Sequence, residues 1–127
     1  MSEQGPGRLR RALSRWTSST QELEAEELHE GSVERGCTAV AELVPRSRAR
    51  VSGTLRSVTL RPRAGVPALV AELYDGTGVL SIVWLGRRTI PGISPGRLLV
   101  ATGRILVDDD RPSMYNPRYQ LLPPGSE

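Results

Sequence analysis

The chain has 127 residues, enough for one small domain whose core must form without Phe, because the sequence contains none. Its one cysteine, Cys37, excludes an internal disulfide and any zinc site built from several cysteines. No apolar run approaches the roughly 20 residues of a membrane-spanning helix, and residues 1–16 are polar and basic rather than a signal peptide, so we expect a cytoplasmic protein.

Positive charge is concentrated in the middle of the chain. All 17 basic residues are Arg. Residues 1–45 carry five Arg and eight acidic residues, a net charge of −3. Residues 46–107 carry ten Arg and two acidic residues, a net charge of +8. Residues 108–127 carry two Arg and four acidic residues, a net charge of −2, so the whole chain has a net charge of +3. A segment at +8 attracts polyanions, and phosphate backbones are the commonest of these. For any single Arg, an ordinary solvated surface charge remains the alternative.

The N-terminal part of the chain predicts three helical segments. Residues 5–16 form a basic arm with one apolar helical stripe, and the Thr/Ser run over residues 17–20 interrupts it. Ser19, with a Glu three residues later, has the spacing of a capping box, so we expect a second, strongly acidic helix over about residues 20–30. Residues 37–44 carry a short helical stripe and are expected to cap one end of the domain that follows.

Five strand-like segments follow, rich in β-branched and aromatic residues and separated by turn residues. They cover residues 51–61, 66–74, 79–85, 97–107 and 112–122. The apolar phase slips by one residue between Leu55 and Val58, which indicates a β-bulge of the kind that lets a long strand turn a corner in a small barrel. We therefore predict a mainly β fold, a five-stranded antiparallel barrel with an N-terminal helical extension. We predict three parts of the chain. Residues 1–36 form a partly flexible basic arm and the acidic helix, residues 37–122 form the barrel with its capping helix, and residues 123–127 form a disordered tail.

The most informative motif is Asp75-Gly76-Thr77-Gly78, between the second and third strand-like segments. Its two glycines supply the positive-φ positions that a hairpin connection needs. Such a hairpin inside a small, Arg-rich, all-β pattern resembles the second and third strands of an OB-fold, which commonly binds oligonucleotides on this face.

The order of further motifs resembles the OB-fold nucleic-acid-binding group over about residues 46–122. These motifs are Gly53-Thr54-Leu55, Trp84-Leu85-Gly86-Arg87, Gly103-Arg104 and Met114-Tyr115-Asn116-Pro117-Arg118-Tyr119. The last is similar to the end of the wedge domain in branched-DNA helicases, where an Asn/His-Pro-Glu-Tyr pattern recurs, with Arg118 here in place of Glu. Because this chain has no P-loop and no helicase motor, the resemblance implies a standalone bacterial OB-fold module that does not unwind DNA by itself.

Single-stranded nucleic acid binds proteins through cationic grooves, and guanidinium groups suit it because they grip phosphate with a bidentate fork and also stack on bases. The Arg residues at the predicted loops and strand ends are therefore the first half of the candidate site. They are Arg56, Arg61, Arg63, Arg87, Arg88, Arg104 and Arg118, with Arg111 close by in the sequence.

Aromatic side chains on which bases stack form the second half of the site. The candidates are Tyr74, Trp84, Tyr115 and Tyr119. Trp84 alternates with two aliphatic residues, which favours a place in the core over a stacking platform. Tyr74 shares a strand face with Glu72, so it is the better platform candidate. Of Tyr115 and Tyr119, we expect one to pack inward and one to face out, and the sequence does not say which.

Catalysis finds little support in the sequence. His29 stands alone on the acidic helix, and the run Asp108-Asp109-Asp110 favours a solvated turn over a cation site. We therefore predict no catalytic residue, no metal site and no cofactor. The predicted function is non-enzymatic binding of nucleic acid, with single-stranded or branched DNA favoured. The alternatives are a protein-interaction module, whose N-terminal helices dock a protein partner, and an accessory subunit of an enzyme.

Overall fold

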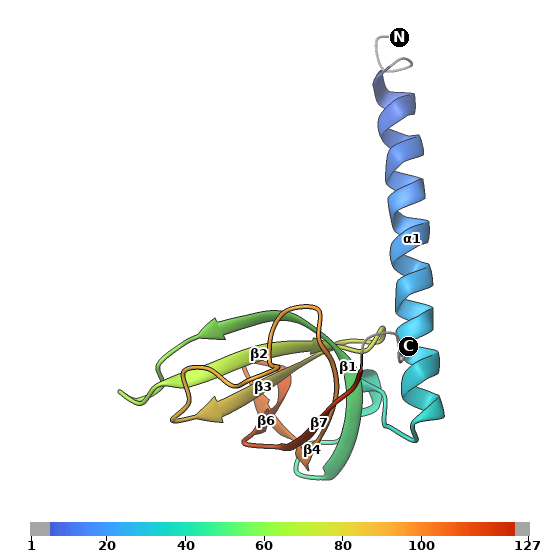
Figure 1. Ribbon diagram of the computed structural model, residues 1–127. Coiled ribbons are helices and arrows are strands. Elements are labelled where there is room, and N and C mark those ends of the chain that lie inside the picture. The colour runs from blue at the N-terminus through green and yellow to red at the C-terminus, as the bar shows by residue number, and fades with distance from the viewer. Residues whose placement is uncertain (1–5, 124–127) are drawn as a thin grey trace.

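The computed structural model describes the backbone of residues 6–123 and the side chains of residues 19–123. The described chain is mainly β, with one long N-terminal helix (Figure 1). Its elements in order are α1 (Pro6–Glu34), the 3₁₀ turn η1 (Val40–Glu42), β1 (Arg48–Leu60), β2 (Ala68–Tyr74), β3 (Val79–Leu85), β4 (Leu98–Arg104), β5 (Leu106–Asp108), β6 (Arg111–Tyr115) and β7 (Arg118–Leu121). No helix in this part of the chain is both long and apolar enough to cross a bilayer. Of the predicted tail, only Pro123 falls within the described residues.

The helix α1 runs without a break from Pro6 to Glu34, so the prediction of two helices separated at residues 17–20 is wrong. Ser and Thr are weaker helix formers than Ala by only about 0.5 kcal/mol per residue, and a short run of them without Gly or Pro does not end a helix. Pro6 suits the first helical position, where its missing N–H is not needed. Only the C-terminal end of α1 meets the sheet, and the rest projects away from it (Figure 1).

The predicted helix over residues 37–44 is also wrong, because only η1 forms there. The Thr38 N–H donates to the Arg50 carbonyl oxygen at 2.8 Å, which holds this segment extended beside β1. Ala39 and Leu43, on either side of η1, both have extended backbone. Pairing with a distant strand thus overrides the local helical stripe.

The strands form one seven-stranded sheet in the order β5-β6-β3-β2-β1-β4-β7. The predicted five-stranded antiparallel barrel is corrected in two respects. The predicted fourth strand is divided into β4, which pairs with β1, and β5, which pairs with β6. The predicted fifth strand is divided into β6, which pairs with β3, and β7, which pairs with β4. The β3–β6 pair is parallel, and strand pairing does not close the sheet into a ring, because β5 and β7 lie at its two edges.

The predicted bulge in the first strand is confirmed. The pairing of β1 with β2 shifts register between Leu55 and Ser57. Leu55 before the shift and Val58 after it both face the core, so Arg56 and Ser57 lie together on the outer face of the sheet. The bulge therefore gives the outer face two polar side chains where regular alternation would give one.

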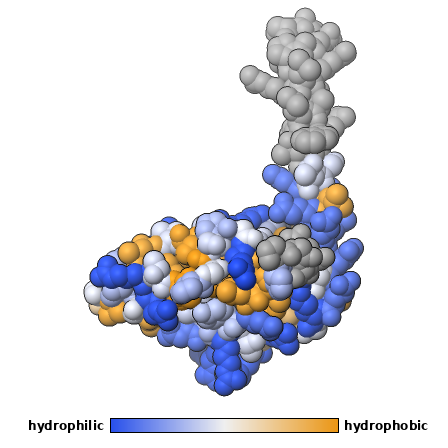
Figure 2. All heavy atoms as spheres, viewed as in Figure 1, coloured by the Kyte–Doolittle hydropathy of each residue, from blue (hydrophilic) through white to orange (hydrophobic). Residues whose placement is uncertain are grey.

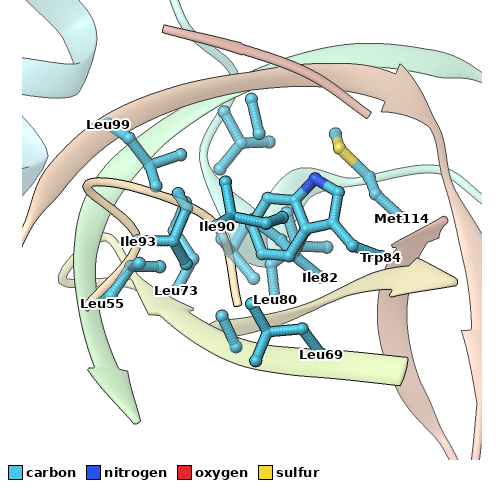
Figure 3. Packing of buried hydrophobic residues seen from close by; sticks show 14 of the residues in the cluster. Leu55, Leu69, Leu73, Leu80, Ile82, Trp84, Ile90, Ile93, Leu99 and Met114 are labelled. Carbon is cyan, nitrogen blue, oxygen red and sulfur yellow. The ribbon is translucent and has the colours of Figure 1, made fainter. Parts of the chain in front are cut away.

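The core lies between the inner faces of the strands (Figure 3). Trp84 is 5% exposed and belongs to this core. Its alternation with aliphatic residues favoured this place over a role as a stacking platform. Ile90 and Ile93 enter the same cluster from the Gly/Pro-rich connection between β3 and β4. The aliphatic and thioether side chains around them come from every long strand, namely Val51, Leu55, Leu69, Leu73, Leu80, Ile82, Leu99, Ala101 and Met114.

The hairpin between β2 and β3 is a docking point for the N-terminal segment. The Asp75 carboxylate is fully buried and accepts hydrogen bonds from the Val40 N–H at 2.8 Å and from the N–H groups of Thr77 and Gly78 at 2.9 and 3.1 Å. It also accepts the Thr77 hydroxyl proton at 2.7 Å, and that hydroxyl in turn accepts the Ala41 N–H at 3.1 Å. One carboxylate thus fixes both the turn and η1.

The helix α1 packs directly on the same turn. Gly76 has φ +93°, and a Cβ at this position would collide with the backbone carbonyl oxygen of Ala25 in α1. The turn therefore requires Gly for two reasons, its left-handed backbone and the close approach of the helix.

Replacing the Asp75 carboxylate with an amide tests its role in stability. Asp75→Asn keeps the size of the side chain but loses one acceptor oxygen, which leaves buried N–H groups without a partner. We expect the free energy of unfolding, measured by urea denaturation, to fall by about 3 kcal/mol. The control Asp109→Asn, at an exposed turn position, should change it by less than about 0.5 kcal/mol. Equal effects of the two variants would contradict this role for Asp75.

The contact between α1 and the turn can be tested with two glycines. Gly65 also has a positive φ, +78°, but a Cβ there meets nothing within 4 Å. Replacing either glycine with Ala should therefore lower the free energy of unfolding by about 1–2 kcal/mol through backbone strain. At Gly76, but not at Gly65, the substitution should lower the free energy of unfolding by a further ~1–3 kcal/mol, because the new methyl group overlaps the backbone of α1, and it should make α1 more accessible to protease. Unfolding titrations and limited proteolysis of Gly76→Ala and Gly65→Ala measure the difference, and indistinguishable behaviour would rule out tight docking of α1.

Candidate nucleic-acid interface

A groove crosses the outer face of β1, β2 and β3, and we call it the β1–β2–β3 groove. Its floor and walls are Ser57, Thr59, Arg61, Arg63, Val70, Glu72, Ser81, Asp108, Asp109 and Arg111. Strand register explains the floor, because Ser57 lies opposite Glu72, Thr59 opposite Val70, and Glu72 opposite Ser81. The walls come from the connection between β1 and β2 and from the turn between β5 and β6.

Backbone pairing positions both walls. The Arg61 N–H donates to the Ala68 carbonyl oxygen at 2.8 Å, and Arg63 exchanges backbone hydrogen bonds with Val66, so the hairpin continues beyond β1 and carries both Arg residues with it. On the opposite wall, Asp109 and Asp110 have φ of 50° and 61°. Asp tolerates this left-handed region and suits such tight turns, which accounts for the acidic run as turn chemistry.

The Arg residues of the groove are paired with its own carboxylates. Arg111 lies 2.6 Å from Glu72, which also accepts the Ser57 hydroxyl proton at 2.8 Å. Arg63 lies 3.6 Å from Asp108, which also accepts the hydroxyl proton of Tyr115. The lining contains three Arg and three carboxylates, so the groove is close to neutral although the surrounding segment is strongly basic.

These contacts shift two pKa values. The hydrogen bond from Ser57 is the main cause that lowers the pKa of the Glu72 carboxyl, and Arg111 lowers it further, against a smaller opposing effect of burial. The hydrogen bond to Asp108 is the main cause that raises the pKa of the Tyr115 hydroxyl, and burial adds to it. At neutral pH Glu72 is therefore an anion bound to Arg111, and Tyr115 keeps its proton.

Two tyrosines extend the groove, and each is accompanied by an Arg. Tyr74 follows Glu72 by two residues on the same face of β2, and the Arg56 guanidinium carbon lies 3.5 Å from the centre of its ring. The Arg63 guanidinium carbon lies 5.9 Å from the centre of the Tyr115 ring, and Arg63 also donates to its hydroxyl at 3.2 Å. Cationic and aromatic groups thus converge on one outer face.

The other two aromatic candidates point elsewhere. The Trp84 ring is buried, so it offers no surface to a base, and it meets the Tyr119 ring edge-on at 5.6 Å between centroids. Tyr119 lies opposite Ala101, an inward-facing residue of β4, and is 39% exposed. Tyr115 is half-buried and lies beside Asp108, whereas Tyr119 meets the core at Trp84 but is the more exposed of the two, so the expectation of one inward and one outward ring stays a prediction.

The predicted Arg residues divide among three places. Arg61 and Arg63 line the groove, with Arg56 beyond its floor on Tyr74. Arg87 and Arg88 are exposed in the connection after β3 and are absent from the groove lining. Arg104 and Arg118 lie on the sheet formed by β1, β4 and β7, away from the groove.

Sequence analysis missed most of the groove lining, including the three residues that hold its Arg and Tyr side chains, Ser57, Glu72 and Asp108. Glu72 served only to place Tyr74 on a strand face, Asp108 was assigned to a solvated turn, and the contact of Ser57 depends on the bulge. The sequence did contain one sign of Glu72, because strand alternation placed it on the same outward face as the stacking candidate Tyr74. The pairs themselves join residues far apart in the chain, Arg111 with Glu72 and Arg63 with Asp108, which local patterns do not reveal.

The comparison with known proteins rests on structure alone. No protein-family model matches the sequence, and a search of curated proteins gave no match either. Similar solved structures include two OBodies, each bound to hen egg-white lysozyme, and the replication factor A related protein from Methanobacterium thermoautotrophicum. Their identities to this chain are 16%, 15% and 14%, and the TM-scores are 0.53, 0.54 and 0.52. The matches cover 67%, 68% and 69% of this chain and 92%, 90% and 92% of theirs, which supports an OB-like fold.

The ion pair in the groove predicts a pH dependence of stability. The pKa of Glu72 is lower in the folded protein than its ordinary value near 4.5, so its ionised form stabilises the fold above about pH 4.5. This contribution is lost as the pH falls through the folded pKa. We expect Glu72→Gln to be less stable than the wild type near neutral pH, with a difference that shrinks on acidification. Urea denaturation across this range, with exposed Glu42→Gln as control, tests it, and a pH-independent difference would contradict it.

Proposed function

We propose that this protein is a non-enzymatic OB-fold module that binds single-stranded nucleic acid, DNA in particular, in the β1–β2–β3 groove. The observation that carries the proposal is the convergence of Arg and Tyr side chains on this outer face, Arg56 with Tyr74 and Arg63 with Tyr115. Such a combination provides both phosphate ligands and stacking surfaces. The likeness to a replication factor A related protein supports the same class of ligand.

In this proposal Arg61 and Arg63 hold the phosphates. Arg63 and Asp108 are 42% and 44% exposed and 3.6 Å apart, and an exposed ion pair of this kind stabilises a protein by only about 0–1 kcal/mol. A phosphate group can therefore take the place of Asp108 at little cost. Arg111 stays with Glu72, because their contact at 2.6 Å is supported by Ser57.

Bases stack at the two tyrosines. The guanidinium of Arg56 lies over the ring of Tyr74, so a base stacks on the guanidinium or replaces it on the ring. Tyr115 is held by its hydrogen bond to Asp108, which orients its ring at the other end of the groove. Neither contact requires a particular base, so the proposed binding tolerates many sequences. A branched DNA offers the same unpaired bases at its junction and is the second proposed substrate.

The second candidate function is a protein-interaction module. Two similar structures are OBodies bound to lysozyme, so this type of fold has a protein partner there. The near-neutral charge of the groove is compatible with such a partner, because a polyanion gains little from a groove that its own carboxylates neutralise.

A titration with an oligonucleotide at several salt concentrations separates the two functions. Two phosphate contacts to a single strand contribute about −1.4 to the slope of log affinity against log salt, and Arg61→Gln with Arg63→Gln should remove that part. Tyr74→Ala should instead weaken binding by about 1–3 kcal/mol at an unchanged slope. Fluorescence anisotropy with single-stranded and forked DNA measures both.

The matched control is Arg87→Gln with Arg88→Gln, which removes the same charge outside the groove. It should leave the slope nearly unchanged. If both double variants flatten the slope equally, binding follows net charge and not the groove. If the wild-type protein binds no oligonucleotide even at low salt, the nucleic-acid proposal is wrong and the protein-interaction module replaces it.

A further inference from the structure

A second outer surface carries the Arg residues that do not belong to the groove. In the pairing of β1 with β4, Arg48 lies opposite Arg104 and Arg50 lies opposite Thr102. In the pairing of β4 with β7, Thr102 lies opposite Arg118. Residues two apart on a strand share a face, so all four Arg side chains lie on one side of the sheet. We call this surface the β1–β4–β7 face. The alternate residues of these strands, such as Val51 and Ala101, are fully buried on the inner side.

In the described part of the chain, the four Arg of the β1–β4–β7 face are not paired with carboxylates. Among residues 19–123, Arg63 and Arg111 each have an ion pair within 4.0 Å, whereas none is found for these four Arg. The next cross-strand row holds Ser52, Val100 and Gln120, which are uncharged. Arg35, just after α1, donates to the Ser52 hydroxyl at 2.8 Å beside this row.

This arrangement costs stability in the absence of a ligand. Like charges in directly opposite positions of neighbouring strands, such as Arg48 and Arg104, destabilise a sheet. The groove shows that this chain places carboxylates beside Arg elsewhere, at Glu72 and Asp108. A bound polyanion removes the repulsion on the β1–β4–β7 face and takes the role that those carboxylates have in the groove.

The face also contains a place for a single phosphate. A depression is lined by Arg50, Val100, Thr102, Arg118, Tyr119 and Gln120. Thr102 lies between Arg50 and Arg118 in one cross-strand row, and neighbouring strands are about 4.8 Å apart, so both Arg side chains and the Thr102 hydroxyl line the same depression. Tyr119 meets Trp84 edge-on and is 39% exposed at this depression.

We propose that the β1–β4–β7 face is a second nucleic-acid surface that binds the phosphodiester backbone without contacting bases. Its ligands are the guanidinium groups of Arg48, Arg50, Arg104 and Arg118, with the Thr102 hydroxyl. Because no stacking is involved, double-stranded DNA suits this face as well as a single strand does, which separates it from the groove. The proposal does not depend on the function proposed for the groove.

A short DNA duplex is the probe, because it offers phosphates but no unstacked bases. The test variant replaces Arg48, Arg50, Arg104 and Arg118 with Gln. The wild type should bind the duplex at low salt, and the variant should lose this binding, with the log–log salt slope reduced by about 3.6 for four contacts. The control replaces Arg61, Arg63, Arg87 and Arg88 with Gln, which removes the same charge, and it should retain duplex binding with its slope.

Two further measurements keep the result decisive. The thermal unfolding of the test variant should be no lower than that of the wild type at low salt, because repulsion is removed. If it nevertheless fails to fold, Arg118→Glu on the edge strand β7 replaces it and should weaken duplex binding with a slope reduced by about 0.9 or more. Retained duplex binding in the test variant, or equal losses in test and control, would overturn the proposal.

A protein occupant would give a different result. Residues 19–34 of α1 carry six exposed Glu and no Arg, and their surface is mainly hydrophilic (Figure 2), so a second copy of this chain is the competing partner. If sedimentation shows self-association that the test variant abolishes, while duplex binding is unchanged, the occupant is a second copy and the proposal is wrong. Loss of single-strand binding in the groove variants alone bears only on the function proposed for the groove.

Discussion

The buried carboxylate of Asp75 is the contact on which the arrangement of the molecule depends. A fully buried anion is costly unless hydrogen bonds compensate it, and here three N–H groups and one hydroxyl do so. They come from the turn itself and from Val40, 35 residues earlier in the chain. The same turn receives α1 at Gly76. One side chain thus fixes the β2–β3 hairpin and the segment before β1, and the turn that it holds is the one on which α1 packs. The motif that looked most like a binding signature therefore has a structural role, and Asp75 has no free oxygen directed at a ligand.

The two outer faces show that a high net charge on a segment does not by itself make a basic surface. Alternation along the strands distributes the Arg residues between two sides, and long-range pairing then decides which of them keep their charge unopposed. In the groove, Glu72 and Asp108 neutralise Arg111 and Arg63. Across β1, β4 and β7, the residues opposite Arg are Thr or another Arg. The electrostatic attraction for a polyanion is therefore greatest on the face that the resemblance to OB-folds did not indicate, while the two Arg–Tyr pairs lie beside the groove.

Features that depend on local periodicity could be predicted from the sequence. The positions of the strands, the bulge after Leu55 and the inward place of Trp84 all follow from alternation of apolar residues. Features decided by distant contacts could not. Residues 37–44 have a helical stripe, but Thr38 pairs with Arg50 instead. The fifth predicted strand is interrupted at Asn116 and Pro117, as the sequence predicted, but the change of partner there from β3 to β4 is a distant contact that the sequence did not show. Asn116 has φ 49°, and its side chain accepts the Leu85 N–H at 2.9 Å, so the corner is stabilised by a residue of β3.

The bulge in β1 links the local pattern to the groove. Without it, Ser57 would point inward and Val58 outward, and the apolar phase of the second half of β1 would face solvent. With it, Arg56 and Ser57 are both on the outer side, where Arg56 reaches the ring of Tyr74 and Ser57 donates to Glu72. The contact of Arg56 with the Tyr74 ring and the hydrogen bond from Ser57 to Glu72 therefore depend on one extra residue in a strand. The same residue lets Leu55 and Val58 both pack inward, so one irregularity serves both the core and the outer face.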